Sequence, residues 1–276
     1  APSSTSAAAL SPWGVNGPMG RTVADCHLLL SAQASFDRRD LFSTESNVKI
    51  IEPLAEVDLR DIRVAVSSDL GCAPVCKSIV ATFEARMKVL SGEFGSVEET
   101  APNFDGIHKV FDVFRGIAFI AAHGDLVTNH RAQLDRNVIA NVEQGRRYNL
   151  QDVADAQKLH TRIYRENLGF FDDFDVMICP AAAVSPFPHT QAYVDEINDE
   201  KMPNYMSWLA LSYAPTMAFG CSAVLPFGCD DKGLPFGIQV IGAKGADHKV
   251  LQIAQALESV IAGQSDIAAP KMAAHF

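Results

Sequence analysis

Residues Ile62 to Ser67 read IRVAVS, and a helix-spaced series of apolar residues follows them as far as Leu90. The first segment is short, rich in β-branched residues and bounded by charged residues and Gly71, which is typical of a buried strand. The apolar residues of the second segment form a stripe on one face of a predicted helix: Val75, Ile79, Phe83, Met87 and Leu90. A strand followed at once by an amphipathic helix is a unit of layered α/β folds.

The alternation of strands and helices continues on both sides of this unit. A helix is predicted from about Thr22 to Ala34, with Thr22 and Asp25 at capping-box spacing. The further predicted elements, in chain order, are a weak strand at Val97, helices between Phe111 and Tyr148, a helix over Gln151–Leu168, a strand over Phe174–Cys179 stopped by Pro180, a helix from Tyr205, a hairpin of Ala223–Phe227 with Phe236–Ile241 around Gly233, and a last helix from Asp247, its cap, to Ile261. We therefore predict an α/β fold with a mixed, largely buried sheet flanked by helices.

The domain organisation follows from the same pattern. Residues 1–18 are predicted to be an irregular N-terminal segment, residues 19–262 a single α/β domain, and residues 263–276 a flexible C-terminal tail. The stretch from Ala181 to Pro203 is rich in proline and is predicted to be an irregular surface or lid loop.

Composition excludes several classes of protein. The chain has 276 residues, of which 48% are apolar and 20% charged, so it is long and apolar enough to bury a substantial core. The formal charge of -10 would repel nucleic acid and anionic membranes. Apolar runs stop short of the roughly 18 residues that a membrane span needs. Six cysteines are too few for a disulfide scaffold, and we expect a cytoplasmic protein with free thiols.

Common reactive motifs are missing from the sequence, including G-x-S-x-G, phosphate loops and H-E-x-x-H. Cys72 and Cys76 lack a second pair at zinc-finger spacing, so no metal site is predicted. Cys179 and Cys221 end apolar segments beside loops, which keeps a cysteine nucleophile open as an alternative to two core thiols. The acidic and basic residues between Asp37 and Asp40 are interpreted as a solvated charged turn.

Several ordered blocks carry a family resemblance. Asn16–Asp25 reads NGPMGRTVAD, and Asp175–Pro188 reads DVMICPAAAVSPFP. Gly233–Gly242 reads GLPFGIQVIG, and the preceding segment Tyr205–Cys221 contains WLALSY and a Gly-Cys pair. In this order the blocks resemble the amidase signature family, and the matching segments extend over most of residues 14–260.

The resemblance implies hydrolysis of amide C–N bonds by a serine that is activated through a second serine, in a cis peptide, and a lysine. All three precede the G-P-M block in the family, so we expect none of the catalytic residues within this chain, and no cofactor. The part that remains resembles the substrate-facing wall of the fold. The residues that we expect to bind substrate there are Phe111, Phe114, Tyr205, Trp208 and Cys221.

Two departures from the family lie near the expected site. Ser222 stands where a proline often follows the Gly-Cys pair, and the segment to Gly228 is one residue shorter than is usual. A change of length inside a strand shifts its register or forces a bulge.

Three functions remain open from the sequence. The chain is the C-terminal portion of a cytoplasmic amidase, an inert amidase-like remnant or binding module, or a cysteine-dependent enzyme. In the first case its partners are a small-molecule amide and a complementing N-terminal half or a second copy. Strands without their partners would then leave an open edge and favour self-association.

Overall fold

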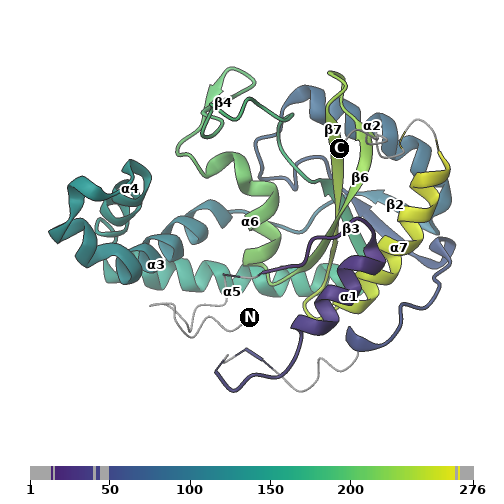
Figure 1. The fold of residues 1–276 in the computed structure, drawn as a ribbon, viewed down its shortest axis with the longest axis horizontal. Helices are drawn as coiled ribbons and strands as arrows, with labels where there is room; N and C mark the ends of the chain where they lie inside the picture. The colour runs from purple at the N-terminus through teal and green to yellow at the C-terminus, as the bar shows by residue number, and fades with distance from the viewer. Residues whose placement is uncertain (1–13, 15, 40–41, 44–49, 265–266, 268–276) are drawn as a thin grey trace, which may run out of the picture.

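The computed structural model describes residues 14, 16–39, 42–43, 50–264 and 267. Its centre is a five-stranded sheet in the order β2-β1-β3-β7-β6 (Figure 1). The helices are α1 (Val23–Gln33), α2 (Lys77–Leu90), α3 (Ile107–Asn129), α4 (Arg136–Gly145), α5 (Leu150–Asp173), α6 (Ala210–Met217) and α7 (Asp247–Gly263). The strands are β1 (Arg63–Val66), β2 (Ser96–Glu99), β3 (Val176–Pro180), β4 (Glu196–Ile197), β5 (Glu200–Lys201), β6 (Cys221–Cys229) and β7 (Pro235–Gly242).

The sheet is mixed, as predicted. Strand β1 pairs in parallel with β2 and with β3, whereas β3 with β7 and β7 with β6 are antiparallel. All five residues of β3 are buried, while the edge strand β2 is exposed along its whole length. The α/β fold class is therefore confirmed, with the most deeply buried strand at the centre of the sheet.

Helices cover both faces of the sheet. Helices α2 and α7 lie on one face, and α6 lies on the other together with α3 and α5 (Figure 1). Gln239 of β7 is buried under α6, where its side-chain amide donates a hydrogen bond to the Leu211 carbonyl oxygen at 3.0 Å. The α3–α4 pair extends away from the sheet at one end of the molecule, and α1 packs beside α7 at the other (Figure 1).

Local sequence signals account for most element boundaries. Thr22 caps α1 by accepting a hydrogen bond from the Asp25 amide at 3.1 Å. Asn149 and Asp152 form a full capping box, and α5 starts one residue before the predicted Gln151 and ends five residues after the predicted Leu168, at Asp173. Gly233 adopts a φ of 75° in the β6–β7 turn, a conformation that favours glycine.

Several predictions about the elements are wrong. Helix α6 begins at Ala210 and not at Tyr205, and Pro180 is the last residue of β3 and not the residue that stops it. Ala246, not Asp247, is the N-cap of α7, and Asp247 lies in the first turn, where its charge still favours the helix dipole. The loop from Ala181 to Pro203 is not wholly irregular, because β4 and β5 form a two-residue ladder within it. Asn198 and Asp199 make the tight turn of this ladder in the left-handed region of φ.

The register of β6 against β7 is irregular between Pro226 and Cys229, in the segment where the sequence predicts a shift or a bulge. Gly228 has a φ of 77° at this bulge. Arg86 of α2 donates hydrogen bonds to the carbonyl oxygens of Phe227 and Cys229, and its guanidinium lies over the Phe236 ring, 5.4 Å from the centroid. The bulge is therefore held by a side chain from a neighbouring helix.

The described residues leave some boundaries untested. Most of the predicted N-terminal segment 1–18 and of the tail 263–276 lies outside them. Within the described part of the chain, none of the helices combines the length and the hydrophobicity that crossing a bilayer requires.

Candidate functional site

A cavity of about 560 Å³ lies beyond the C-terminal end of the parallel strand β1. Its walls come from the loop after β1, the first turns of α3, β5 with the chain that follows it, and Tyr213 of α6. Open α/β sheets place ligands at this edge, and the volume is in the range of small-molecule sites. The fold therefore singles out this cavity as the candidate site.

The loop after β1 is a tight turn that its own side chains stabilise. Ser67 accepts a hydrogen bond from the Leu70 amide at 2.9 Å, and Asp69 accepts one from the Gly71 amide at 2.7 Å. Leu70 and Gly71 both have positive φ angles, of 57° and 65°. This turn brings the Cys72 backbone to the cavity wall.

The β4–β5 ladder is fixed to the same wall. The Asn198 side chain donates a hydrogen bond to the Val75 carbonyl oxygen at 2.9 Å and accepts one from the Lys77 amide at 3.0 Å. Asn198 thereby joins the loop after β3 to the start of α2. As a result, Glu200 and Lys201 line the same cavity as Cys72.

His108 connects three walls of the cavity. Its Nε2 atom lies 3.0 Å from the Cys72 carbonyl oxygen, which only accepts, so Nε2 carries the proton. The Nδ1 atom of the same ring is hydrogen-bonded to the Tyr213 hydroxyl. Burial raises the pKa of Tyr213, which keeps this hydroxyl protonated. Stacking of Tyr213 on Phe111, with centroids 4.0 Å apart, completes this corner.

Asp112 is the half-buried carboxylate of the cavity. It lies one turn after His108 on α3, so the two side chains share a face of the helix. Burial raises the pKa of the Asp112 carboxyl group, and the nearby His108 and Arg115 oppose that rise. A carboxyl group with a raised pKa in a cleft is a mark of functional sites.

Three of the five residues that the sequence predicts for substrate binding lie close together around Arg115. The Arg115 guanidinium is 5.8 Å from the Phe111 ring centroid and 5.5 Å from that of Tyr205. Trp208 donates a hydrogen bond from its indole nitrogen to the Tyr205 carbonyl oxygen at 3.1 Å. Phe111 also lines the cavity, whereas Tyr205 and Trp208 flank it within a segment that lines it.

The other two predicted residues lie elsewhere. Phe114 packs against His160, which is hydrogen-bonded to the Met217 carbonyl oxygen, with the Phe114 and His160 rings 5.5 Å apart. Cys221 starts β6 and donates a hydrogen bond to the Ala243 carbonyl oxygen at 3.3 Å. The structure therefore does not bring Phe114 and Cys221 together with the aromatic group around Arg115.

Of the residues that line the cavity, the sequence predicts only Phe111 as a site residue, and the polar residues that it misses include His108, Asp112, Asn204 and Tyr213. The spacing of His108 and Asp112, four residues apart, is a usable signal once the helix is known to begin at Ile107, before the predicted start at Phe111. The contact of His108 with Tyr213 joins residues 105 positions apart and has no local signal.

The two cysteines that the sequence leaves open as nucleophiles, Cys179 and Cys221, are a buried and a half-buried thiol, respectively. Burial raises the pKa values of Cys179 and Cys221 to about 12, so both are neutral thiols at physiological pH. The six cysteines are all free. Among the described residues no group of three or more His, Cys, Asp or Glu side chains is placed to hold a metal ion.

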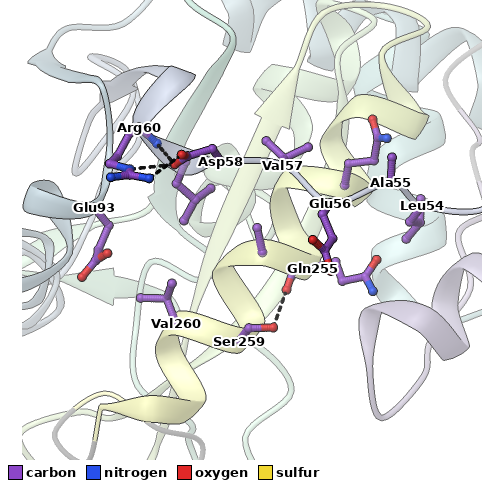
Figure 2. A pocket seen from close by; sticks show the side chains of 13 residues that line it. Leu54, Ala55, Glu56, Val57, Asp58, Arg60, Glu93, Gln255, Ser259 and Val260 are labelled. Carbon is purple, nitrogen blue, oxygen red and sulfur yellow. Dashed lines mark hydrogen bonds and ion pairs between the residues drawn. The ribbon is translucent and has the colours of Figure 1, made fainter.

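A second hollow, of about 430 Å³, lies between residues 54–60 and α7 (Figure 2). Its arginine and one of its carboxylates are already paired, since the Arg60 guanidinium donates to the Asp58 carboxylate at 2.6 Å. The Arg60 side-chain hydrogen bond lowers the pKa of Asp58 to about 2. Ser259 bonds within its own helix, to the Gln255 carbonyl oxygen. This surface therefore offers less to a ligand than the cavity at Asp112.

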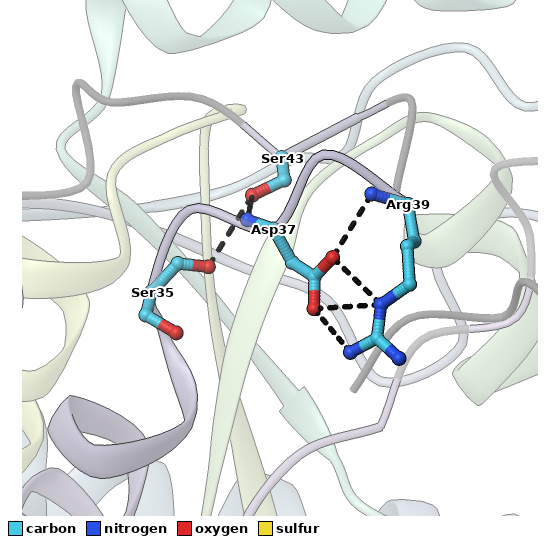
Figure 3. A network of polar contacts seen from close by, with 4 residues as sticks. All are labelled: Ser35, Asp37, Arg39 and Ser43. Carbon is cyan, nitrogen blue, oxygen red and sulfur yellow. Dashed lines mark hydrogen bonds and ion pairs between the residues drawn. The ribbon is translucent and has the colours of Figure 1, made fainter.

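The charged turn after α1 is held by its own residues (Figure 3). Asp37 accepts hydrogen bonds from the Arg39 backbone and guanidinium, the shortest at 2.6 Å, and the Arg39 side chain is 62% exposed. The Arg39 side-chain hydrogen bond lowers the pKa of Asp37 to about 2. These contacts agree with the interpretation as a solvated turn, while Asp40 lies outside the described residues.

The layered α/β fold, with a cavity beyond the C-terminal end of β1, places the chain in the class of mixed-sheet α/β proteins. Residues 6–251 match the amidase family, and the chain belongs to that family. The expected resemblance is therefore confirmed.

The relatives that this chain matches are about twice as long as the matching segment. The chain is 25% identical to an acylamidase of Rhodococcus erythropolis over 251 residues, which are 90% of this chain and 52% of that protein. It is 26% identical to a subunit of the glutamyl-tRNA(Gln) amidotransferase of Acidothermus cellulolyticus, over 88% of this chain and 53% of that protein. A bacterial aryl acylamidase of the amidase signature family has a similar fold, with a TM-score of 0.78 and 24% identity over 88% of this chain and 52% of the other. The chain thus spans about half the length of these relatives.

Proposed function

We propose that this chain is the C-terminal portion of an amidase that hydrolyses amide C–N bonds, with its nucleophile supplied by a segment that these 276 residues do not include. The observation that carries the proposal is the family match over residues 6–251 of a chain that spans about half of its relatives. The substrate is a small-molecule amide, and the partner of the chain is a complementing N-terminal half or a second copy.

The chemistry of amide hydrolysis supports a nucleophile from outside this chain and a cavity wall from within it. Acyl transfer requires a nucleophile, a proton acceptor and preorganised donors for the developing oxyanion. The two thiols that the sequence offers as alternatives, Cys179 and Cys221, have pKa values near 12 and are poor nucleophiles at neutral pH. The described residues supply instead a cavity wall with one half-buried carboxylate and a hydrogen-bonded His–Tyr pair. Free cysteines are consistent with the reducing cytoplasm as the site of action.

The test compares this chain with the full reading frame from which it comes. The nucleotide sequence ahead of the Ala1 codon is determined, and both proteins are purified and assayed with an anilide and a simple carboxamide. We expect hydrolysis, and labelling of a serine by a fluorophosphonate, only in the longer protein. Serine-dependent hydrolysis by the 276 residues alone contradicts the proposal. A longer protein that folds but cleaves no amide favours the inert remnant.

A further inference from the structure

The cavity at Asp112 has more negative than positive charge in its wall. Its carboxylates are Asp69, Asp112 and Glu200, and its lysine is Lys201. Three carboxylates against one lysine give these side chains a net charge of -2, which favours cationic over anionic ligands.

Asp112 differs in its charge partners from three aspartates with lowered pKa values. Asp37, Asp58 and Asp175 each form a salt bridge with an arginine. Within the described part of the chain Asp112 takes part in no salt bridge, although it is half-buried. Its polar neighbours are the side chains of Asn204 and Gln144, and Arg115 lies nearby. A partly desolvated carboxylate without a salt-bridge partner gains more from a bound ammonium group than an exposed one does.

The rest of the cavity suits an apolar body attached to that charge. Phe111 and Tyr213 stack on each other in the wall, and the chain after β5 adds Met202, Pro203 and Met206 to it. Methionine side chains adapt to irregular apolar shapes and make favourable contacts with aromatic rings. A ring of phenyl size with a short arm is therefore compatible with both the volume and the chemistry of the wall.

We infer that this cavity is a binding site for primary amines with an aromatic or other compact apolar body, whose ammonium group is bound by Asp112. The Asp112 carboxylate accepts hydrogen bonds from the ammonium, and the side chains around Phe111 and Met206 cover the apolar part. The inference goes beyond the proposed function, because it concerns binding by these residues and requires no hydrolysis.

The experiment measures binding to the purified 276-residue chain by isothermal titration calorimetry. The probes are 2-phenylethylamine, which is protonated at neutral pH, its uncharged counterpart 2-phenylethanol, and the anion phenylacetate. We expect the amine to bind most tightly and phenylacetate not to bind. Asp112→Asn is expected to weaken the amine by at least about tenfold, as loss of a charge-assisted hydrogen bond does, and to leave 2-phenylethanol nearly unchanged.

Matched variants separate this site from general charge effects. Asp125→Asn makes the same change at an exposed position of the same helix and is expected to leave amine binding unchanged. Glu200→Gln, at an exposed position of the wall, is expected to weaken amine binding less than Asp112→Asn does. Thermal unfolding verifies that each variant is folded.

Three results overturn the inference: no binding of the amine to the folded protein, equal binding of the amine and the alcohol, or unchanged amine affinity in a folded Asp112→Asn variant. No amide is turned over in these titrations. Failure of the longer protein to hydrolyse amides would therefore leave the inference intact, and failure of amine binding would leave the amidase proposal intact.

Discussion

Asp112 keeps its negative charge at a cost in stability, because burial raises the pKa of its carboxyl group above the ordinary value of 3.8. A carboxyl group with a raised pKa favours the folded state below its ordinary pKa, and this contribution is lost as the pH rises through the raised value. We predict that Asp112→Asn raises the melting temperature at neutral pH and that the difference from the wild type disappears near pH 3.8.

Thermal unfolding monitored by circular dichroism at the two pH values measures this effect. Asp125→Asn is the control, because its carboxylate is exposed on the same helix. A folded Asp112→Asn variant that melts below the wild type at neutral pH would show that the charge stabilises the free protein. Loss of ligand binding together with a gain in stability is the pattern expected of a residue retained for function.

The Arg86 side chain contacts the bulge of β6 and is expected to stabilise it. Its two hydrogen bonds satisfy the carbonyl oxygens of Phe227 and Cys229. We predict that Arg86→Leu lowers the free energy of unfolding by about 1–3 kcal/mol, because two acceptors then lack their donor. Urea unfolding measures this change, and Arg86→Lys is expected to fall between the wild type and Arg86→Leu. Equal stability of all three proteins would show that water replaces the guanidinium.

At the scale of elements, Asp175 joins β3 to β1 and α7. Its carboxylate receives hydrogen bonds from the Arg63 amide at 2.9 Å and from the Lys249 ammonium at 2.7 Å. Burial alone would raise the pKa of Asp175, but the Arg63 and Lys249 side chains outweigh it and lower the pKa from 3.8 to about 2. Because the folded-state pKa is lowered, this contribution is present above pH 3.8 and is lost as the pH falls toward 2.

We predict that Asp175→Asn reduces the free energy of unfolding by at most about 2 kcal/mol at neutral pH, since both partners are about half exposed and partly screened. Chemical unfolding at neutral pH and at successively lower pH values measures the loss. The difference between variant and wild type should shrink on acidification. A difference that is constant with pH would assign the effect to packing and not to charge.

An element can be predicted from the sequence when residues close together in the chain determine it. The β1–α2 unit and the β6–β7 hairpin are set by apolar periodicity and by Gly233, so the sequence predicts both. The β4–β5 ladder has two residues in each strand and depends on Asn198 contacts with Val75 and Lys77, more than 120 positions away. Such contacts produce no local pattern.

The candidate site divides in the same way. Phe111 was predicted because aromatic residues at helical spacing are visible in the sequence, and it does line the cavity. Tyr213 is missing from that prediction, because its role comes from a fold that brings α6 against α3 and the Cys72 loop. Sequence reasoning therefore found an aromatic wall but not the polar groups that give the cavity its charge.

At the scale of the whole molecule, the two edges of the sheet differ in how they resist association. The exposed edge strand β2 carries Glu98 and Glu99, and charged residues at an edge discourage pairing with another chain. The opposite edge strand β6 has the sequence CSAVLPFGC, without a charge, and its Val224 is 60% exposed. In the described structure β6 pairs only with β7. The edge at β6 is therefore the more open of the two to a partner strand.

We predict that the 276-residue chain self-associates through β6 when it is purified alone, and that Val224→Lys shifts it toward monomer. A lysine on an exposed edge opposes strand pairing through its charge and the cost of desolvating it. Val97→Lys is the matched control, because Val97 is 37% exposed on the other edge, which already carries charge. Sedimentation velocity over a range of concentrations measures the outcome. A wild-type chain that stays monomeric at all concentrations would contradict the prediction, and it would also weaken the proposal that this surface is covered by a complementing half or a second copy.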